Sequence, residues 1–260
     1  MVLAVLVVGA AGVWSLTRAT APRPSLTTAD IPALQVTAAN VRPGSAIPVR
    51  LTAADPTTTV QTTRRPTSLT DWANRVTGRT GIPTPALRAY GNAELAMRAT
   101  EPACHLSWAT LAGIGRVESD HGRFGGARLL ANGEESRPVV GVPLDGTGGV
   151  RNVPDTDGGR YDGDPTHDRA VGPMQFLPGT WASYGADAMG TGRPDPENVN
   201  DAALAAAHYL CAGGRDLGTP SGWWSGLLSY NDSGVYGQKV FGLADAYARQ
   251  ALAALDATSH

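Results

Sequence analysis

The sequence predicts a mainly α-helical domain with long irregular loops, preceded by a disordered linker. Helices are indicated because apolar residues recur at spacings of three and four in several segments, and no segment alternates apolar and polar residues as a strand would. Loops are indicated because the 260 residues include 32 glycines and 19 prolines but only 17% charged residues. That composition excludes a charge-rich coiled coil.

The first 17 residues predict an export signal or a membrane anchor. Residues 1–16 carry no charged side chain. This run is shorter than the roughly 20 residues that cross a bilayer, but it suits the core of a signal peptide. Pro22 directly follows the small-residue site Ala19, Thr20, Ala21 and disfavours cleavage there, so release and membrane tethering both stay open. Either outcome places the protein outside the cytoplasm, in the cell envelope.

Residues 18–67 are rich in Thr, Ala and Pro and lack sustained apolar periodicity. Such a segment cannot bury enough apolar surface to offset the entropy lost on ordering. We therefore expect a linker that holds the following domain away from a membrane. The apolar stretch at residues 47–51 could form a strand, but nothing nearby pairs with it.

The folded domain is expected at residues 68–258, and two helices open it. One begins near Leu69, with Thr70 as its capping residue and Asp71 in its first turn. The next begins around Pro85, because proline suits the first position of a helix. Its apolar positions are Leu87, Tyr90, Leu95 and Met97.

A third helix, over residues 107–122, carries the most informative pattern. Ser107 is its expected capping residue, and Gly122 marks its end. Its apolar residues recur every three positions: Trp108, Leu111, Ile114 and Val117. Glu118 follows Ile114 by four residues, which puts this carboxylate on the apolar face of the helix.

The position of Glu118 favours a catalytic role over a structural one. Burial raises the pKa of a carboxyl group toward neutrality, as a general acid requires. A structural glutamate would more often cap the start of a helix or join an ion pair. Glu118 instead lies near the helix end, where the helix dipole disfavours negative charge.

The rest of the domain combines a long loop with further helices. Residues 125–169 are dense in Gly, Pro and Asp without helical or strand periodicity, and such long loops are usually functional or disordered. A short helix is expected after Pro178. Three more are expected at residues 200–212, with Asn200 as the cap, at 222–230 and at 236–255.

Cys104 and Cys211 are the only cysteines. An even number of cysteines in an exported protein is expected to be oxidised, so we predict one disulfide between them. In a cytosolic protein, two unrelated core thiols would be the better interpretation, and the apolar N-terminus reverses that preference.

Four ordered motifs resemble those of lytic murein transglycosylases, most closely the B-type branch and its secreted actinobacterial relatives. The motifs are LAGIGRVESDHGRFGG, AVGPMQFLPGTWASYGAD, NDAALAAAHYLC and SYNDSGVYGQKV, and the resemblance covers roughly residues 69–254. It implies a lysozyme-like α domain that cleaves the glycan strands of peptidoglycan.

The resemblance also implies roles for single residues. Glu118 falls on the glutamate of the family's E-S/T motif, the sole catalytic acid and base. The implied substrate-binding residues are Thr166, Gln175, Tyr230, Asn231 and Tyr236. Ordinary roles stay open for four of them: a turn for Thr166, a helix cap for Gln175 and core packing for the two tyrosines.

In the implied reaction, Glu118 protonates the oxygen between N-acetylmuramic acid and N-acetylglucosamine, and an oxocarbenium-like charge develops. The substrate's own N-acetyl group stabilises this charge in place of a second carboxylate. Glu118 then takes the proton of the muramoyl 6-hydroxyl, which closes a 1,6-anhydro ring. Two alternatives stay open: a hydrolytic muramidase with Asp120, Asp164 or Asp168 as second carboxylate, and a non-catalytic peptidoglycan-binding module.

No cofactor and no resident metal are expected. Residues 187–198 overlay an EF-hand loop, but only Asp187 and the turn residue Gly192 are kept, while Met189 and Asn198 occupy oxygen-ligand positions. We therefore predict weak calcium binding or none. The aspartates of the long loop are interpreted as solvated turn residues: Asp155, Asp157, Asp162 and Asp164.

The net charge of -2 argues against nucleic acid as a partner, because neutralising phosphates dominates that affinity. The expected partner is peptidoglycan, and the expected state is a monomer.

Overall fold

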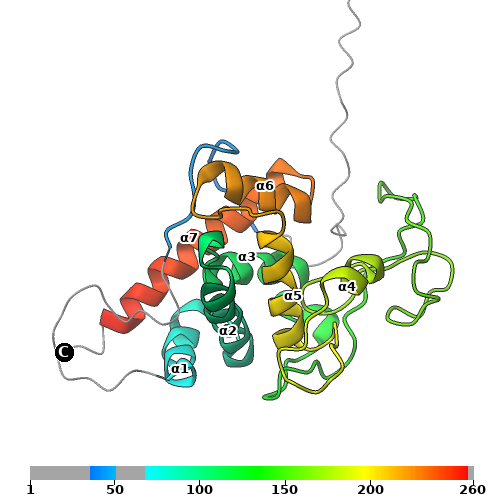
Figure 1. Ribbon diagram of the computed structural model, residues 1–260, viewed down its shortest axis with the longest axis horizontal. Helices are drawn as coiled ribbons and strands as arrows, with labels where there is room; N and C mark the ends of the chain where they lie inside the picture. Colours follow the sequence, from blue (N-terminus) through cyan, green and yellow to red (C-terminus); the bar gives the residue numbers. More distant parts are fainter. Residues whose placement is uncertain (1–35, 51–67, 257–260) are drawn as a thin grey trace, which may run out of the picture.

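The computed structural model describes residues 36–50 and 68–256 and confirms a mainly α-helical fold (Figure 1). Within these ranges there are seven α-helices and isolated β-bridges but no named strand. The helices are α1 (Leu69–Thr80), α2 (Thr84–Thr100), α3 (Trp108–Ser119), α4 (Pro178–Tyr184), α5 (Val199–Cys211), α6 (Pro220–Tyr230) and α7 (Gly234–Asp256). Two short 3-10 turns, η2 (Pro102–Cys104) and η3 (Phe124–Gly126), flank α3.

Helix α3 lies at the centre of the domain. Every one of its residues except Arg116 is buried, because α2 and α7 pack against it. A Cβ atom on Gly113 would lie only 2.8 Å from the Val240 carbonyl oxygen, so the close approach of α3 and α7 requires glycine there. The core of the molecule is therefore built around the helix that carries Glu118.

The helix ends agree with the sequence prediction to within a few residues, and the differences come from the capping residues. Ser107 caps α3 as expected. The cap of α1 is Ser68 rather than Thr70, and the cap of α5 is Asn198 rather than Asn200. A capping residue needs a non-helical backbone, and Thr70 and Asn200 already lie inside the first helical turn.

Helix α3 ends earlier than the glycine rule predicts. Its last residue is Ser119, and Asp120 and His121 already adopt left-handed conformations, with φ of 54° and 59°, before Gly122. Asp and His tolerate this region better than most residues do. Glu118 is therefore the second-last residue of the helix.

Residues 127–177 form the expected long loop, which extends from one side of the domain (Figure 1, green). Isolated antiparallel bridges such as Val140 with Val171 and Pro154 with His167 tie it together. The side chain of Asp155 accepts hydrogen bonds from the main-chain N–H groups of residues 157–159, and Asp168 accepts one from Thr156. In a β-sheet, carbonyl groups of a neighbouring strand accept the main-chain hydrogen bonds. In this loop, aspartate carboxylates accept some of them.

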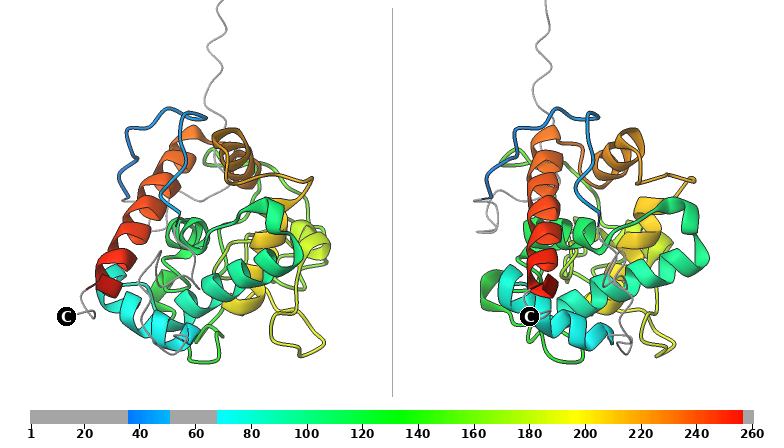
Figure 2. Two further views of the ribbon diagram at one scale, coloured as in Figure 1. Left: turned by 60° about the vertical axis from the view of Figure 1, so that its left-hand side comes forward. Right: turned by 90° about the vertical axis from the view of Figure 1, so that its left-hand side faces the viewer.

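Residues 36–50 differ from the prediction that residues 18–67 form a spacer. Instead of standing away from the domain, this segment lies against α6 and α7 (Figure 2, blue), and Val41, Ile47 and Val49 pack on the core. Its apolar residues find partners on helices rather than on another strand, so residues 47–50 form no strand. Residues 1–35, Leu51 and residues 52–67 lie outside the described ranges, as do residues 257–258 of the predicted domain.

None of the helices in the described ranges is long and apolar enough to span a membrane. The predicted signal or anchor, residues 1–17, lies outside those ranges.

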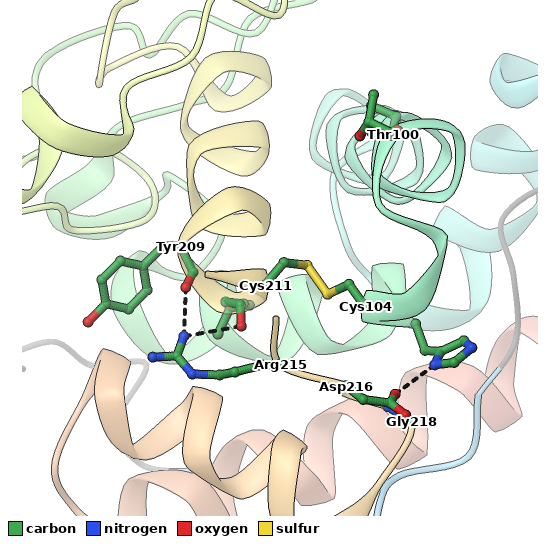
Figure 3. Close-up of a disulfide and its surroundings, with 10 residues drawn as sticks. Thr100, Cys104, Tyr209, Cys211, Arg215, Asp216 and Gly218 are labelled. Carbon is green, nitrogen blue, oxygen red and sulfur yellow. Dashed lines mark hydrogen bonds and ion pairs between the residues drawn. A yellow bond between two sulfur atoms is a disulfide. The ribbon is translucent and has the colours of Figure 1, made fainter. Parts of the chain in front are cut away.

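The predicted disulfide between Cys104 and Cys211 is confirmed, with Cα atoms 5.5 Å apart (Figure 3). It joins the turn before α3 to the end of α5. Nearby, the Leu217 N–H donates to the Cys104 carbonyl at 2.8 Å, and His105 Nδ1 lies 2.6 Å from Asp216 Oδ1. The entry to the central helix is therefore fixed to the far part of the chain.

Candidate active site

Glu118 is buried, with 2% of its surface exposed. Burial raises the pKa of its carboxyl group to about 8, although a hydrogen bond from Tyr236 acts in the opposite direction. The Tyr236 hydroxyl donates to Glu118 Oε1 at 2.7 Å. Because burial outweighs the hydrogen bond, Glu118 is largely protonated at neutral pH and can act as a general acid.

Glu118 lies in a cleft of about 550 Å³, a volume that includes its open mouth. The lining residues come from α3, the end of the long loop, and α4 to α6: Glu118, Ala170, Gln175, Phe176, Leu177, Thr180, Tyr209, Ser229, Tyr230 and Asn231. Four of the residues predicted from the sequence thus come together: Glu118, Gln175, Tyr230 and Asn231. Tyr236 joins them through its hydrogen bond to Glu118.

Tyr230 lines the cleft, and its hydroxyl is hydrogen-bonded to the main chain. The hydroxyl donates to the Met174 carbonyl at 2.7 Å. The ring packs edge-on against Phe176 and Tyr209, with centroids 6.0 and 5.5 Å away. Aromatic side chains with a polar tip suit the faces of sugar rings.

Gln175 is held in an uncommon backbone conformation, with φ of 50°. Its Nε2 donates to the carbonyls of Val139 and Gly172, both at 3.1 Å. This side chain does not cap the next helix, because α4 has Leu177 at its cap position and no side-chain cap. With its amide nitrogen used by the backbone, Gln175 has its oxygen as the acceptor for a ligand.

Thr166 does not line the cleft. It is exposed in the long loop, where its N–H donates to Asp164 Oδ1 at 3.1 Å and its carbonyl accepts from the Asp155 N–H at 3.1 Å. Its placement fits the alternative turn role. Hydrogen bonds of its main chain to the loop therefore fix where Thr166 lies.

The three aspartates considered as a second carboxylate also lie away from the cleft lining. Asp120 pairs with Arg116 and Arg123. Asp164 pairs with Arg169, and the buried Asp168 accepts from Thr156. Glu118 is therefore the only acid among the described residues that line the cleft.

Sequence reasoning missed several lining residues, of which Tyr209 is the clearest. Its hydroxyl donates to the Ser229 carbonyl at 2.7 Å, and its ring contacts both Tyr184 and Tyr230. It lies on α5 within an alanine-rich motif, where nothing in the spacing separates it from a core aromatic. Phe176 and Leu177 directly follow Gln175 in the same motif. That motif is the sequence signal that could have identified them as lining residues.

The carboxylates outside the cleft accept hydrogen bonds from main-chain groups of their own loops. Asp187 accepts from the N–H groups of Thr191 and Gly192 at 3.0 and 2.6 Å, and Asn198 caps α5. Oxygens of Asp155, Asp157 and Asp168 lie within 4.8 Å of one another, a spacing that could hold a metal ion. Each of these three also accepts backbone N–H groups.

Residues 168–225 match the family model described as a transglycosylase SLT domain. The match includes Gln175 and Tyr209 and ends before Tyr230, and Glu118 precedes it. It supports a domain of the lytic transglycosylase type, acting on peptidoglycan outside the cytoplasm. Searches of curated proteins and of solved structures found no significant match.

Proposed function

We propose that the protein is an extracytoplasmic lytic transglycosylase of the B-type branch, related to secreted actinobacterial enzymes. It cleaves the β-1,4 bond between N-acetylmuramic acid and N-acetylglucosamine and leaves a 1,6-anhydromuramoyl end. One observation carries this proposal: among the described residues, Glu118 is the one acid that lines the cleft, together with aromatic rings and amides, and burial raises the pKa of its carboxyl group.

Glu118 supplies the proton in the first step. Its raised pKa keeps the proton available near neutral pH, and transfer to the glycosidic oxygen lets the leaving sugar depart. The Tyr236 hydroxyl, 2.7 Å from Oε1, stabilises the carboxylate that remains. The same tyrosine thus holds the carboxyl group in place before and after the proton leaves.

The positive charge at the anomeric carbon needs stabilisation without a second acid. In the proposed mechanism the substrate's N-acetyl group provides it, and Asn231 and Tyr230 orient the sugar. The Glu118 carboxylate then removes the proton of the 6-hydroxyl, which attacks the same ring. This sequence uses one carboxyl group as acid and then as base, which agrees with the composition of the cleft lining.

A hydrolytic muramidase is less well supported. It would need a second carboxylate about 5–10 Å from Glu118, across the scissile bond. Asp120 and Asp164 are held in ion pairs, and Asp168 is held by Thr156.

The product and the acid can be tested together. Purified peptidoglycan is digested with wild type and with Glu118→Gln, and the fragments are weighed by mass spectrometry. We expect 1,6-anhydro ends from wild type and a loss of at least about 100-fold with Glu118→Gln, the usual range for a general acid. Glu134→Gln, the same change at an exposed acid, is the control and should keep full activity.

Each outcome separates the candidates. Reducing muramic ends without anhydro ends would identify a hydrolase. Binding of peptidoglycan without cleavage by either protein would identify a non-catalytic module. The rate should also fall above about pH 8, where Glu118 loses its proton.

A further inference from the structure

The corner between α6 and α7 carries much of the cleft. Tyr230 ends α6, Asn231 follows it, and Tyr236 lies in the first turns of α7. Short hydrogen bonds close the corner: Ser233 N–H to the Asn231 carbonyl at 2.7 Å, and Gly237 N–H to the Ser233 carbonyl at 3.0 Å. The position of this corner therefore determines where three side chains of the site lie.

Residues 36–50, here called the strap, bind α7 close to Tyr236. The Ala39 N–H donates to the Gln238 carbonyl at 3.2 Å, and Gln238 Nε2 donates back to the Val41 carbonyl at 2.9 Å. Further along, the Val49 N–H donates to Asp245 Oδ1 at 2.9 Å. Two of these bonds fall on the residue two positions after Tyr236.

The strap also binds α6 through Trp224. The indole Nε1–H of Trp224 donates to the Ala46 carbonyl at 2.9 Å. Its ring stacks on Phe241 of α7 at 6.3 Å with an interplanar angle of 18°, and a Cβ on Gly237 would lie 2.6 Å from it. Trp224 therefore connects the strap, α6 and the start of α7 in one contact.

Figure 2 shows the arrangement, with the strap (blue) beside the orange start of α7 in both views. Helix α7 also packs against α3, which carries Glu118. Helix α7 thus contacts both the strap and the helix of the catalytic acid. Loosening the strap removes its hydrogen bonds to Gln238 and Trp224, which are part of what holds this corner.

We propose that the strap is a positioning element of the active site, which fixes the α6–α7 corner so that Tyr236, Asn231 and Tyr230 meet the substrate and Glu118 correctly. This inference rests on the proposed glycan cleavage for its kinetic consequences. The strap contacts no reacting atom and acts through Trp224 and Gln238. Small misplacements of catalytic groups slow reactions strongly. Detaching the strap therefore lowers kcat while the rest of the domain stays folded.

The test detaches the strap in the full-length protein. Ile47→Asp puts a charge where a strap side chain packs on the core, and Trp224→Phe removes the hydrogen bond to Ala46. Asn40→Asp, an exposed strap position, is the matched control for added charge. On soluble glycan strands we expect both strap variants to lower kcat about tenfold with KM changed less than about threefold, while Asn40→Asp stays like wild type.

A double-mutant cycle separates positioning from general damage. If the strap acts through Tyr236, Ile47→Asp lowers kcat by about twofold or less when Tyr236 is already phenylalanine. A full tenfold loss in that background, or no loss in the wild-type background, would overturn the proposal.

Hydrogen–deuterium exchange provides a readout that does not need activity. Ile47→Asp should speed exchange in peptides covering residues 231–240 and leave α5 unchanged. Equal acceleration in all helices would mean a purely structural role and would overturn the proposal. Absence of anhydro products from wild type would refute the proposed function alone, since exchange still reports whether the strap holds the corner.

Discussion

The two sides of the cleft are held by different forces. Glu118, Tyr230 and Asn231 come from helices or their ends, and their positions follow from the burial of apolar side chains. Gln175 comes from the end of the long loop, where main-chain groups and carboxylates supply the contacts. The helical side therefore depends on packing between distant segments, and the loop side on local hydrogen bonds.

This difference predicts which substitutions each side of the cleft tolerates. Apolar packing tolerates substitutions that conserve volume, but truncating a buried side chain costs about 2–5 kcal/mol. A buried main-chain N–H that loses its acceptor keeps the full cost of its desolvation. Substitutions on the helical side should therefore change the free energy of unfolding most. Substitutions on the loop side should mainly change how well ordered the rim of the cleft is.

The largest expected effect breaks the helical side. Replacing both cysteines, as Cys104→Ser with Cys211→Ser, opens a loop closed over 107 residues and should cost about 4–5 kcal/mol of unfolding free energy. Urea unfolding followed by tryptophan fluorescence measures it. A loss below about 1 kcal/mol would mean that packing alone fixes the entry to α3.

An intermediate effect is expected on the loop side from Asp168→Ala. Asp168 is 1% exposed and bonds both the N–H and the hydroxyl of Thr156 at 2.8 Å. Removing this buried carboxylate takes the acceptor from two part-buried donors of Thr156, at about 1–3 kcal/mol. We expect faster hydrogen exchange in residues 153–171 and a lower rate of glycan cleavage, with the exchange of α2 and α5 unchanged.

A matched control lies in the same loop. Asp145 bonds the N–H and hydroxyl of Thr147 in the same manner, at 2.9 and 2.7 Å, but close to solvent. Asp145→Ala should have little effect, because water replaces the lost acceptor. Equal effects of the two variants would contradict the distinction between buried and exposed turn carboxylates.

The smallest expected effect concerns Glu135, where the loop meets the segment before α5. Burial, reinforced by the neighbouring Glu197, raises the pKa of Glu135 from 4.5 to about 11. The folded protein therefore keeps a proton that the unfolded chain releases above pH 4.5. Stability from this group is complete below that pH and falls as pH rises toward 11.

Glu135→Gln should remove this pH dependence, since an amide keeps its hydrogens at every pH. We expect the variant to equal wild type near pH 4 and to become more stable than wild type as the pH rises to 9. Thermal melts from pH 4 to 9 measure the difference. Glu134→Gln, at the exposed neighbour, should follow wild type throughout.

The helical side was predictable from the sequence because its signals are local. Spacings of three and four placed Glu118 on the buried face of α3, and Ser107 marked where that helix starts. Thr70 and Asn200 were mistaken for caps because several polar residues precede each helix, and only backbone geometry decides among them. Errors of one or two residues at helix ends follow directly.

The loop side and the strap were less predictable because their partners are distant in sequence. The resemblance implies a substrate-binding role for Thr166, whereas hydrogen bonds to Asp155 and Asp164 hold it outside the cleft lining. The strap has no helical or strand period, so its composition indicated a spacer. Its partners, Trp224 and Gln238, lie almost 200 residues further along the chain.

The hydrogen bond between Glu118 and Tyr236 joins residues 118 positions apart. Helix α7 also supplies one wall of the environment that buries the acid. A chain still being synthesised has Glu118 long before it has α7, so the burial that raises the pKa of this carboxyl group is completed late. Under the proposed function, Glu118 therefore becomes a general acid only after α7 has docked against α3.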